Sequence, residues 1–177
     1  MPDSLGGGLS TAVLLFVAVA AAVTDLRQRR IPNSITITGT LLGLLLAALG
    51  GGAAFLQALG GAGIGLAIGM VCFALGILGG GDAKLLMAFG ALMGMARLPG
   101  ALLVSGALGG VVALVFAIRK GVIVPALLGT GRILVRMVGF GRGQPAPVSV
   151  SKAVGEVPYG LAISAGSVFW WFFGGAL

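Results

Sequence analysis

The sequence predicts an all-α polytopic membrane protein, and three observations lead to this fold class. Of the 177 residues, 58% are hydrophobic and only 8% are charged, and the mean hydropathy is +1.15. A soluble domain of this size does not need so much apolar surface. The apolar runs are continuous rather than alternating, which favours membrane helices over membrane strands. The length allows a single membrane domain, residues 1–177, with about six helices of roughly 20 residues each.

Six apolar runs define the expected helices in order along the chain. They lie near residues 8–24, 35–49, 54–78, 84–96, 100–118 and 159–176. The fourth run is short, and we expect the glycine-rich segment before it and helix tilt to complete the span. The connections between the second and third runs and between the fourth and fifth runs, at 97–99, are correspondingly short.

Basic residues orient these helices. If the first helix ends inside the cell, ten of the eleven Lys and Arg residues fall on the cytoplasmic side and only Arg97 falls outside. By the positive-inside rule, the connections 25–34, 79–83 and 119–158 are then cytoplasmic and both termini face out. We therefore expect a multi-pass protein of the cell's inner, or cytoplasmic, membrane. The net charge of +7 indicates contact with anionic lipid headgroups rather than with nucleic acid.

The long cytoplasmic connection 119–158 contains one further expected element. Residues 121–140 are apolar, but Arg132 and Arg136 are one helical turn apart and share a face. This pattern predicts an amphipathic helix lying in the membrane surface. A contact with the active site or its substrate is the alternative role.

Many of the 34 glycines have the spacing of helix contacts. Small residues four positions apart allow helix backbones to approach closely in lipid. We expect these seams to be mostly internal, with a dimer contact as the alternative, and the oligomeric state is not predicted. The spaced sets are Gly61/Gly65/Gly69, Gly39/Gly43, Gly90/Gly94 and Gly106/Gly110.

Two of the four acidic residues are expected at the same membrane face. Asp25 closes the first apolar run and Asp82 precedes the fourth, 57 positions later. Ionisable groups at this depth are costly and are usually functional, and two adjacent carboxyl groups form an acid/base pair. The structural alternatives are a helix N-cap for Asp82 and a surface ion pair with Arg27 or Arg29 for Asp25. Neither alternative explains why both carboxylates are found at one depth.

The residues around both aspartates predict tight turns. Pro32 biases the chain away from helix just before the second run, and Asn33 or Ser34 can cap the helix that follows. Three glycines, Gly79, Gly80 and Gly81, precede Asp82 and allow the backbone to approach a substrate closely.

These motifs resemble those of the type IV prepilin peptidases, which are GxGD-type aspartic membrane proteases. The pattern D-x-R-x-x-x-I-P-N runs from Asp25 to Asn33, and G-x-G-D-x-K runs from Gly79 to Lys84. The segment from Val157 to Ile163 is similar to the Pro-aromatic-Gly segment that opens the family's last helix. The resemblance implies that Asp25 and Asp82 are the catalytic pair of an endopeptidase that removes the cytoplasmic leader of a prepilin. The other implied substrate-binding or site-shaping residues are Arg30, Pro32, Asn33, Gly79, Gly80, Gly81, Lys84, Glu156, Pro158, Tyr159 and Gly160.

The single cysteine narrows the resemblance. Larger members carry paired CxxC motifs and also N-methylate the mature pilin, whereas Cys72 is the only cysteine here. The chain is therefore similar to the small peptidases that process Flp-type prepilins of Tad pilus secretion systems, or related pseudopilins. Such a substrate has a basic leader followed by a hydrophobic helix. No cofactor is expected, and without His or a second Cys no metal site is expected.

Several roles stay open in the sequence. Lys84 either extends to lipid headgroups or takes part in the site, and Glu156 is either solvated or supports the substrate. Because Asp25 is near the negative end of one helix and Asp82 near the positive end of another, we expect Asp82 to be the ionised partner. The alternative functions are a small ion-coupled transporter that uses both aspartates as ion sites, and a noncatalytic subunit of a secretion machine.

Overall fold

The structure is a computed structural model that describes residues 5–119, 121 and 159–174. Within these ranges it contains helices and no strand, so the predicted all-α class is confirmed there. Residues 122–140 of the expected surface helix, together with Glu156, Pro158 and both chain ends, lie outside the described residues. The helices are α1 (Leu5–Gln28), α2 (Asn33–Leu49), α3 (Gly52–Ala74), α4 (Gly80–Arg119) and α7 (Tyr159–Phe173).

A short, sharply bent segment separates α1 from α2. Arg29 has a left-handed backbone (φ 52), and its N–H donates to the carbonyl oxygen of Asp25 at 2.8 Å, which ends α1. Pro32 has an extended backbone (φ −61, ψ 139) and precedes α2. No side chain caps this helix start, so the expected capping by Asn33 or Ser34 is wrong.

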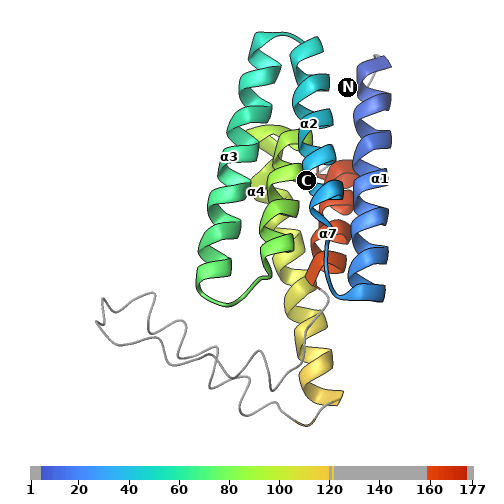
Figure 1. Ribbon diagram of the computed structural model, residues 1–177, viewed down its shortest axis with the longest axis vertical. Helices are drawn as coiled ribbons and strands as arrows, with labels where there is room; N and C mark the ends of the chain where they lie inside the picture. The colour runs from blue at the N-terminus through green and yellow to red at the C-terminus, as the bar shows by residue number, and fades with distance from the viewer. Residues whose placement is uncertain (1–4, 120, 122–158, 175–177) are drawn as a thin grey trace, which may run out of the picture.

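The fourth and fifth expected helices form one element, α4, which turns sharply at Gly94. Its backbone angles (φ 75, ψ 169) lie in a region that glycine alone adopts readily. The expected break at 97–99 is therefore misplaced, because the turn comes earlier and Pro99 lies inside the second half of α4. Figure 1 shows the second half running back, so that both ends of α4 reach the same end of the molecule.

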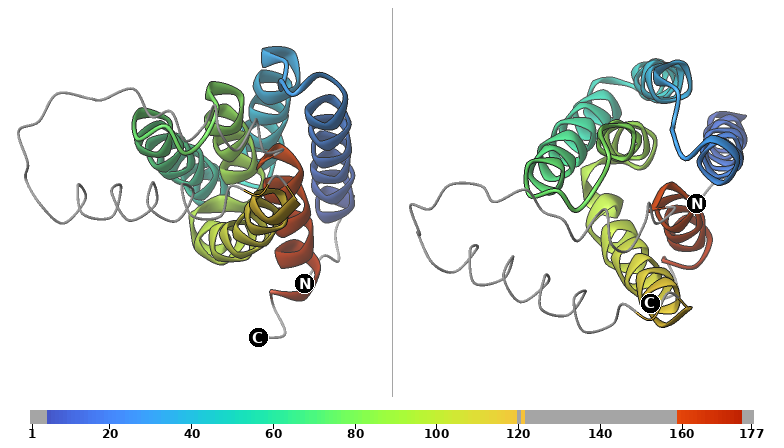
Figure 2. Two further views of the ribbon diagram at one scale, coloured as in Figure 1. Left: turned by 90° about the horizontal axis from the view of Figure 1, so that it is seen from below. Right: turned by 60° about the horizontal axis from the view of Figure 1, so that its bottom comes forward.

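The first half of α4 is the centre of the core. Helices α2, α3 and α7 pack against α4, while α1 packs mainly against α7 and α2, an arrangement visible from two further directions in Figure 2. Leu85 and Phe89 are fully buried, and Leu86 is only 4% exposed. Asp82, which follows the three glycines, is thus attached to the half of α4 that packs in the core.

Glycines of α3 form the expected internal seam with α4. A Cβ added at Gly61 or Gly65 would overlap the backbone of α4, and one at Gly69 would lie 2.7 Å from the Cα of Ala83. The close approach of these two backbones is the contact that the spacing predicted. Gly106 and Gly110 differ, because an added Cβ there would meet nothing within 4 Å.

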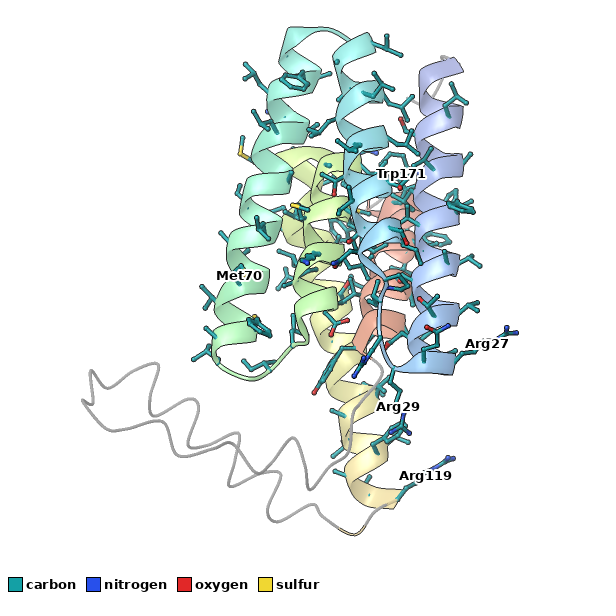
Figure 3. The ribbon with its side chains drawn as sticks, viewed as in Figure 1. Arg27, Arg29, Met70, Arg119 and Trp171 are labelled. Atoms are coloured by element: carbon teal, nitrogen blue, oxygen red, sulfur yellow. The ribbon has the colours of Figure 1, made fainter. Side chains whose placement is uncertain are left out.

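Length and composition mark three helices as able to cross a membrane. They are Gly7–Gln28, Gly52–Ala74 and the turned α4, whereas α2 and α7 are shorter apolar helices. In Figure 3, Arg27, Arg29 and Arg119 lie at one end of the bundle and Trp171 lies away from it. Arg97 is 5.1 Å from the centre of the Trp171 ring, so it is separated from those arginines. The number of spans and the orientation in the membrane stay predictions.

Candidate active site

Asp25 is buried at the last turn of α1, beside the start of α7. Its side chain is only 7% exposed, and its Oδ2 accepts the backbone N–H of Leu161 at 3.2 Å. Leu161 belongs to the first turn of α7, whose free N–H groups carry partial positive charge. The carboxylate therefore lies at a helix N-terminus that is not its own.

Asp82 is the third residue of α4 and is half-buried. Its Oδ2 accepts the backbone N–H of Gly79 at 3.0 Å, which closes the turn before the helix. A side chain that reaches back from this position to the preceding backbone N–H is one half of a capping box. The carboxylate is thus bound to its own loop rather than acting as the N-cap that the sequence allowed.

The fold brings the two aspartates together, although 57 positions separate them. Ile31 links them: its Cβ lies 3.1 Å from where a Cβ of Gly81, the residue before Asp82, would be, and its Cδ1 borders the same point of Gly160 as Oδ2 of Asp25. The first residue of α7, Tyr159, has its ring 3.5 Å from where a Cβ of Gly109 would be. Three segments distant in sequence, the end of α1 and the starts of α4 and α7, therefore meet at one centre.

The glycines of the motifs differ in how closely they are packed. An added Cβ at Gly81 would lie 3.1 Å from the Cβ of Ile31, and one at Gly160 would lie 2.9 Å from Oδ2 of Asp25. At Gly79 the nearest atom would be Oδ2 of Asp82, at 3.2 Å. Gly80 has ordinary space, with its nearest neighbour 3.7 Å away. Close approach thus requires glycine at positions 81 and 160 far more than at position 80.

The remaining predicted residues border this centre. Nζ of Lys84 donates to Oδ1 of Asn33 at 2.8 Å and so links α4 to the start of α2. The expected extension of Lys84 to lipid headgroups is therefore replaced by a contact within the protein. Arg30 is exposed, and Pro32 is half-buried in the connection between α1 and α2. Nothing is described for Glu156 or Pro158.

Two residues of the site were not predicted. Leu161 donates the N–H that holds Asp25, and no side-chain pattern signals a backbone donor. Ile31 contacts both Gly81 and Gly160 and is only 8% exposed. The sequence did contain a sign that Ile31 is buried, because it is an isolated apolar side chain between Arg30 and Pro32 in an otherwise polar connection.

Fold and site together define a helical membrane protein with two carboxyl groups at one end of its bundle. The sequence model of the type IV leader peptidase family matches residues 12–114, a stretch that contains Asp25 and Asp82. The chain belongs to this family. Searches of curated proteins and of solved structures give no match.

Proposed function

We propose that the protein is a membrane aspartic endopeptidase in which Asp25 and Asp82 form the catalytic pair. The observation that carries the proposal is the convergence of these two carboxyl groups, each bound by a backbone N–H of a different segment. Membership of the leader peptidase family supports peptide-bond hydrolysis. The described acidic side chains are these two alone, so no other carboxylate of the described chain competes for the role.

The pair acts by acid/base catalysis. One carboxylate takes a proton from water, which attacks the scissile carbonyl carbon, while the protonated partner donates a hydrogen bond to the carbonyl oxygen. The same group then protonates the leaving amine. Two adjacent carboxyl groups resist double ionisation, which retains the one proton that this mechanism needs.

The helix dipoles do not decide which of the two aspartates carries the proton. The sequence placed Asp25 at a negative helix end and Asp82 at a positive one. In the structure Asp25 also faces the positive N-terminus of α7, through the N–H of Leu161. Both carboxylates therefore have a positive helix end nearby, and the two sites share the proton as a coupled pair.

The proposed substrate is a prepilin with a basic leader and a hydrophobic helix. Family membership supports a leader peptide as the segment that is removed. The narrower proposal, a Flp-type prepilin of a Tad system cleaved at the cytoplasmic membrane face, extends the resemblance of the motifs. The apolar helices support an active site that meets its substrate at the membrane.

The decisive experiment removes one ionisable oxygen at a time. Asp25→Asn and Asp82→Asn are nearly isosteric. In an assay with a synthetic Flp-type prepilin as substrate, we expect each substitution to lower the rate of leader cleavage at least about 10³-fold. Asp3→Asn is the matched control and should cleave normally. Each variant is purified in detergent, and its folding is checked by circular dichroism. Substantial cleavage by either folded active-site variant would falsify the catalytic pair and favour a transport or assembly role for the aspartates.

A further inference from the structure

Ile31 contacts both segments that carry the proposed catalytic pair. It lies in the connection between α1 and α2, where Arg29 and Arg30 are exposed, as is Asn33 at the start of α2. In contrast, Ile31 is 8% exposed and belongs to the hydrophobic core. The direction of its side chain follows from the local backbone, because Arg29 turns the chain with a positive φ and Pro32 holds it extended.

On one side, Ile31 packs against the turn that carries Asp82. A Cβ at Gly81 would lie 3.1 Å from the Cβ of Ile31, 3.2 Å from its carbonyl oxygen and 3.4 Å from its nitrogen. The Cα of Gly81 therefore lies directly against the backbone of Ile31. Since Gly79 of the same turn donates its N–H to Asp82, a shift of this turn moves the Asp82 carboxyl group.

On the other side, Ile31 packs against the segment that holds Asp25. A Cβ at Gly160 would lie 2.8 Å from Cδ1 of Ile31 and 2.9 Å from Oδ2 of Asp25. The δ-methyl and the carboxylate thus lie against the same face of α7. The next residue, Leu161, donates its N–H to Asp25, so the position of α7 determines where this oxygen is held.

We propose that Ile31 is a positioning residue that sets the separation of the Asp25 and Asp82 carboxyl groups. Its β-carbon and backbone fix the Gly81 turn, and its δ-methyl fixes the start of α7. The inference rests on the proposed function, because the separation matters for a pair that shares one proton and one substrate. A displacement of about 1 Å in such a pair lowers the rate by as much as about 10²-fold.

The test uses substitutions that remove one contact at a time. Ile31→Val deletes Cδ1 and keeps the β-branch, and we expect kcat for leader cleavage to fall about tenfold with KM little changed. Ile31→Leu keeps the β-carbon and backbone that contact Gly81 but moves the terminal methyl groups, and it should also lower kcat. The pH range of activity should narrow in both, because weaker interaction between the carboxyl groups shrinks the range in which they share one proton.

Ile163→Val is the matched control. Ile163 is 5% exposed and belongs to the same core cluster as Ile31, and the substitution deletes the same methyl group. We expect it to destabilise the protein about as much as Ile31→Val while leaving kcat and the pH range unchanged.

A second measurement tests the contact between Ile31 and Gly160. Gly160→Ala adds a methyl group where Cδ1 of Ile31 lies, so combining it with Ile31→Val should restore part of the activity that Gly160→Ala loses. The positioning role is excluded if Ile31→Val gives the same kcat and pH range as Ile163→Val, and if the effects of Gly160→Ala and Ile31→Val on activity are additive in the double variant. If the positioning role is excluded in this way but Asp25→Asn and Asp82→Asn each abolish cleavage, the proposed function stands without a role for Ile31. If the two aspartate variants still cleave, the proposed function itself fails.

Discussion

The atoms next to each glycine of the Gly79–Gly81 run determine whether the fold requires glycine at that position. Gly81 has the backbone of Ile31 against its Cα, whereas a Cβ at Gly80 would meet only Cε2 of the Phe73 ring, at an ordinary distance of 3.7 Å. A phenyl ring can rotate away from a new methyl group, but a neighbouring backbone cannot move without moving the turn that it belongs to. The three glycines look equivalent in the sequence, yet their neighbours make them unequal.

Alanine substitutions in this run should therefore have opposite outcomes. Gly81→Ala should lower leader cleavage at least about tenfold, because the added Cβ displaces the turn that holds Asp82. Gly80→Ala should retain activity within about twofold, since alanine is well accommodated in the first turn of a helix. Initial cleavage rates of the purified variants at matched concentration test the contrast. Equal losses in the two variants would show that flexibility of the whole run, rather than space at position 81, is what the site requires.

At the level of elements, the turn at Gly94 folds α4 back on itself. The first half packs in the core, and the second half returns along α7 to the end where the proposed site lies (Figure 1). One residue makes this reversal, with backbone angles of φ 75 and ψ 169. The geometry is strained for any residue with a Cβ, independently of the space around it.

Gly94→Ala should therefore destabilise the protein. We expect a loss of about 1–3 kcal/mol in the free energy of unfolding, the cost of holding an L-residue in that region. Gly106→Ala, in the second half of the same helix, is the control. A Cβ there meets nothing within 4 Å, and alanine is the better helix former, so stability should be unchanged or slightly raised. Unfolding in detergent by increasing SDS measures both, and equal stability of the two variants would contradict a strained turn.

Over the whole molecule, the ends of the bundle differ in charge. Arg27, Arg29 and Arg119 occupy the end where Asp25 lies, while Arg97 stands over the ring of Trp171 away from them (Figure 3). By the positive-inside rule, we expect the basic end to face the cytoplasm. The proposed catalytic pair would then lie at the cytoplasmic membrane face, the side on which the leader peptide of a prepilin is expected.

Cysteine labelling in intact cells tests this orientation. In a Cys72→Ala background, Ser34→Cys and Ser149→Cys should resist membrane-impermeant thiol reagents, and Ser4→Cys should react with them. Permeabilised cells are the control, because all three variants should label there. Labelling of Ser149→Cys in intact cells would reverse the orientation and separate the proposed site from its substrate.

The sequence predicted the meeting of the aspartates but not the contacts that hold them. Alternation of apolar runs predicts that Asp25 and Asp82 lie at one membrane face, and this prediction does not depend on the detailed packing. The turn of α4 was misplaced, because Gly94 and Pro99 are both helix breakers and only tertiary packing selects between them. The bond of Lys84 to Asn33 spans 51 positions, and the donation from Leu161 to Asp25 involves a backbone group. Neither leaves a local pattern in the sequence.

The turn at Gly94 also has a consequence for how the chain enters the membrane during synthesis. The first half of α4, Gly80–Met93, is about 21 Å long at 1.5 Å per residue, shorter than the hydrocarbon core of about 30 Å. A helix this short spans the bilayer only with local thinning or with neighbouring helices around it, and no polar loop separates it from the second half. We therefore expect the two halves of α4 to insert together as one hairpin that turns at Gly94, with Arg97 near its tip. If so, the proposed active site assembles only after the ribosome has translated the second half of this hairpin, well after both aspartates have been made.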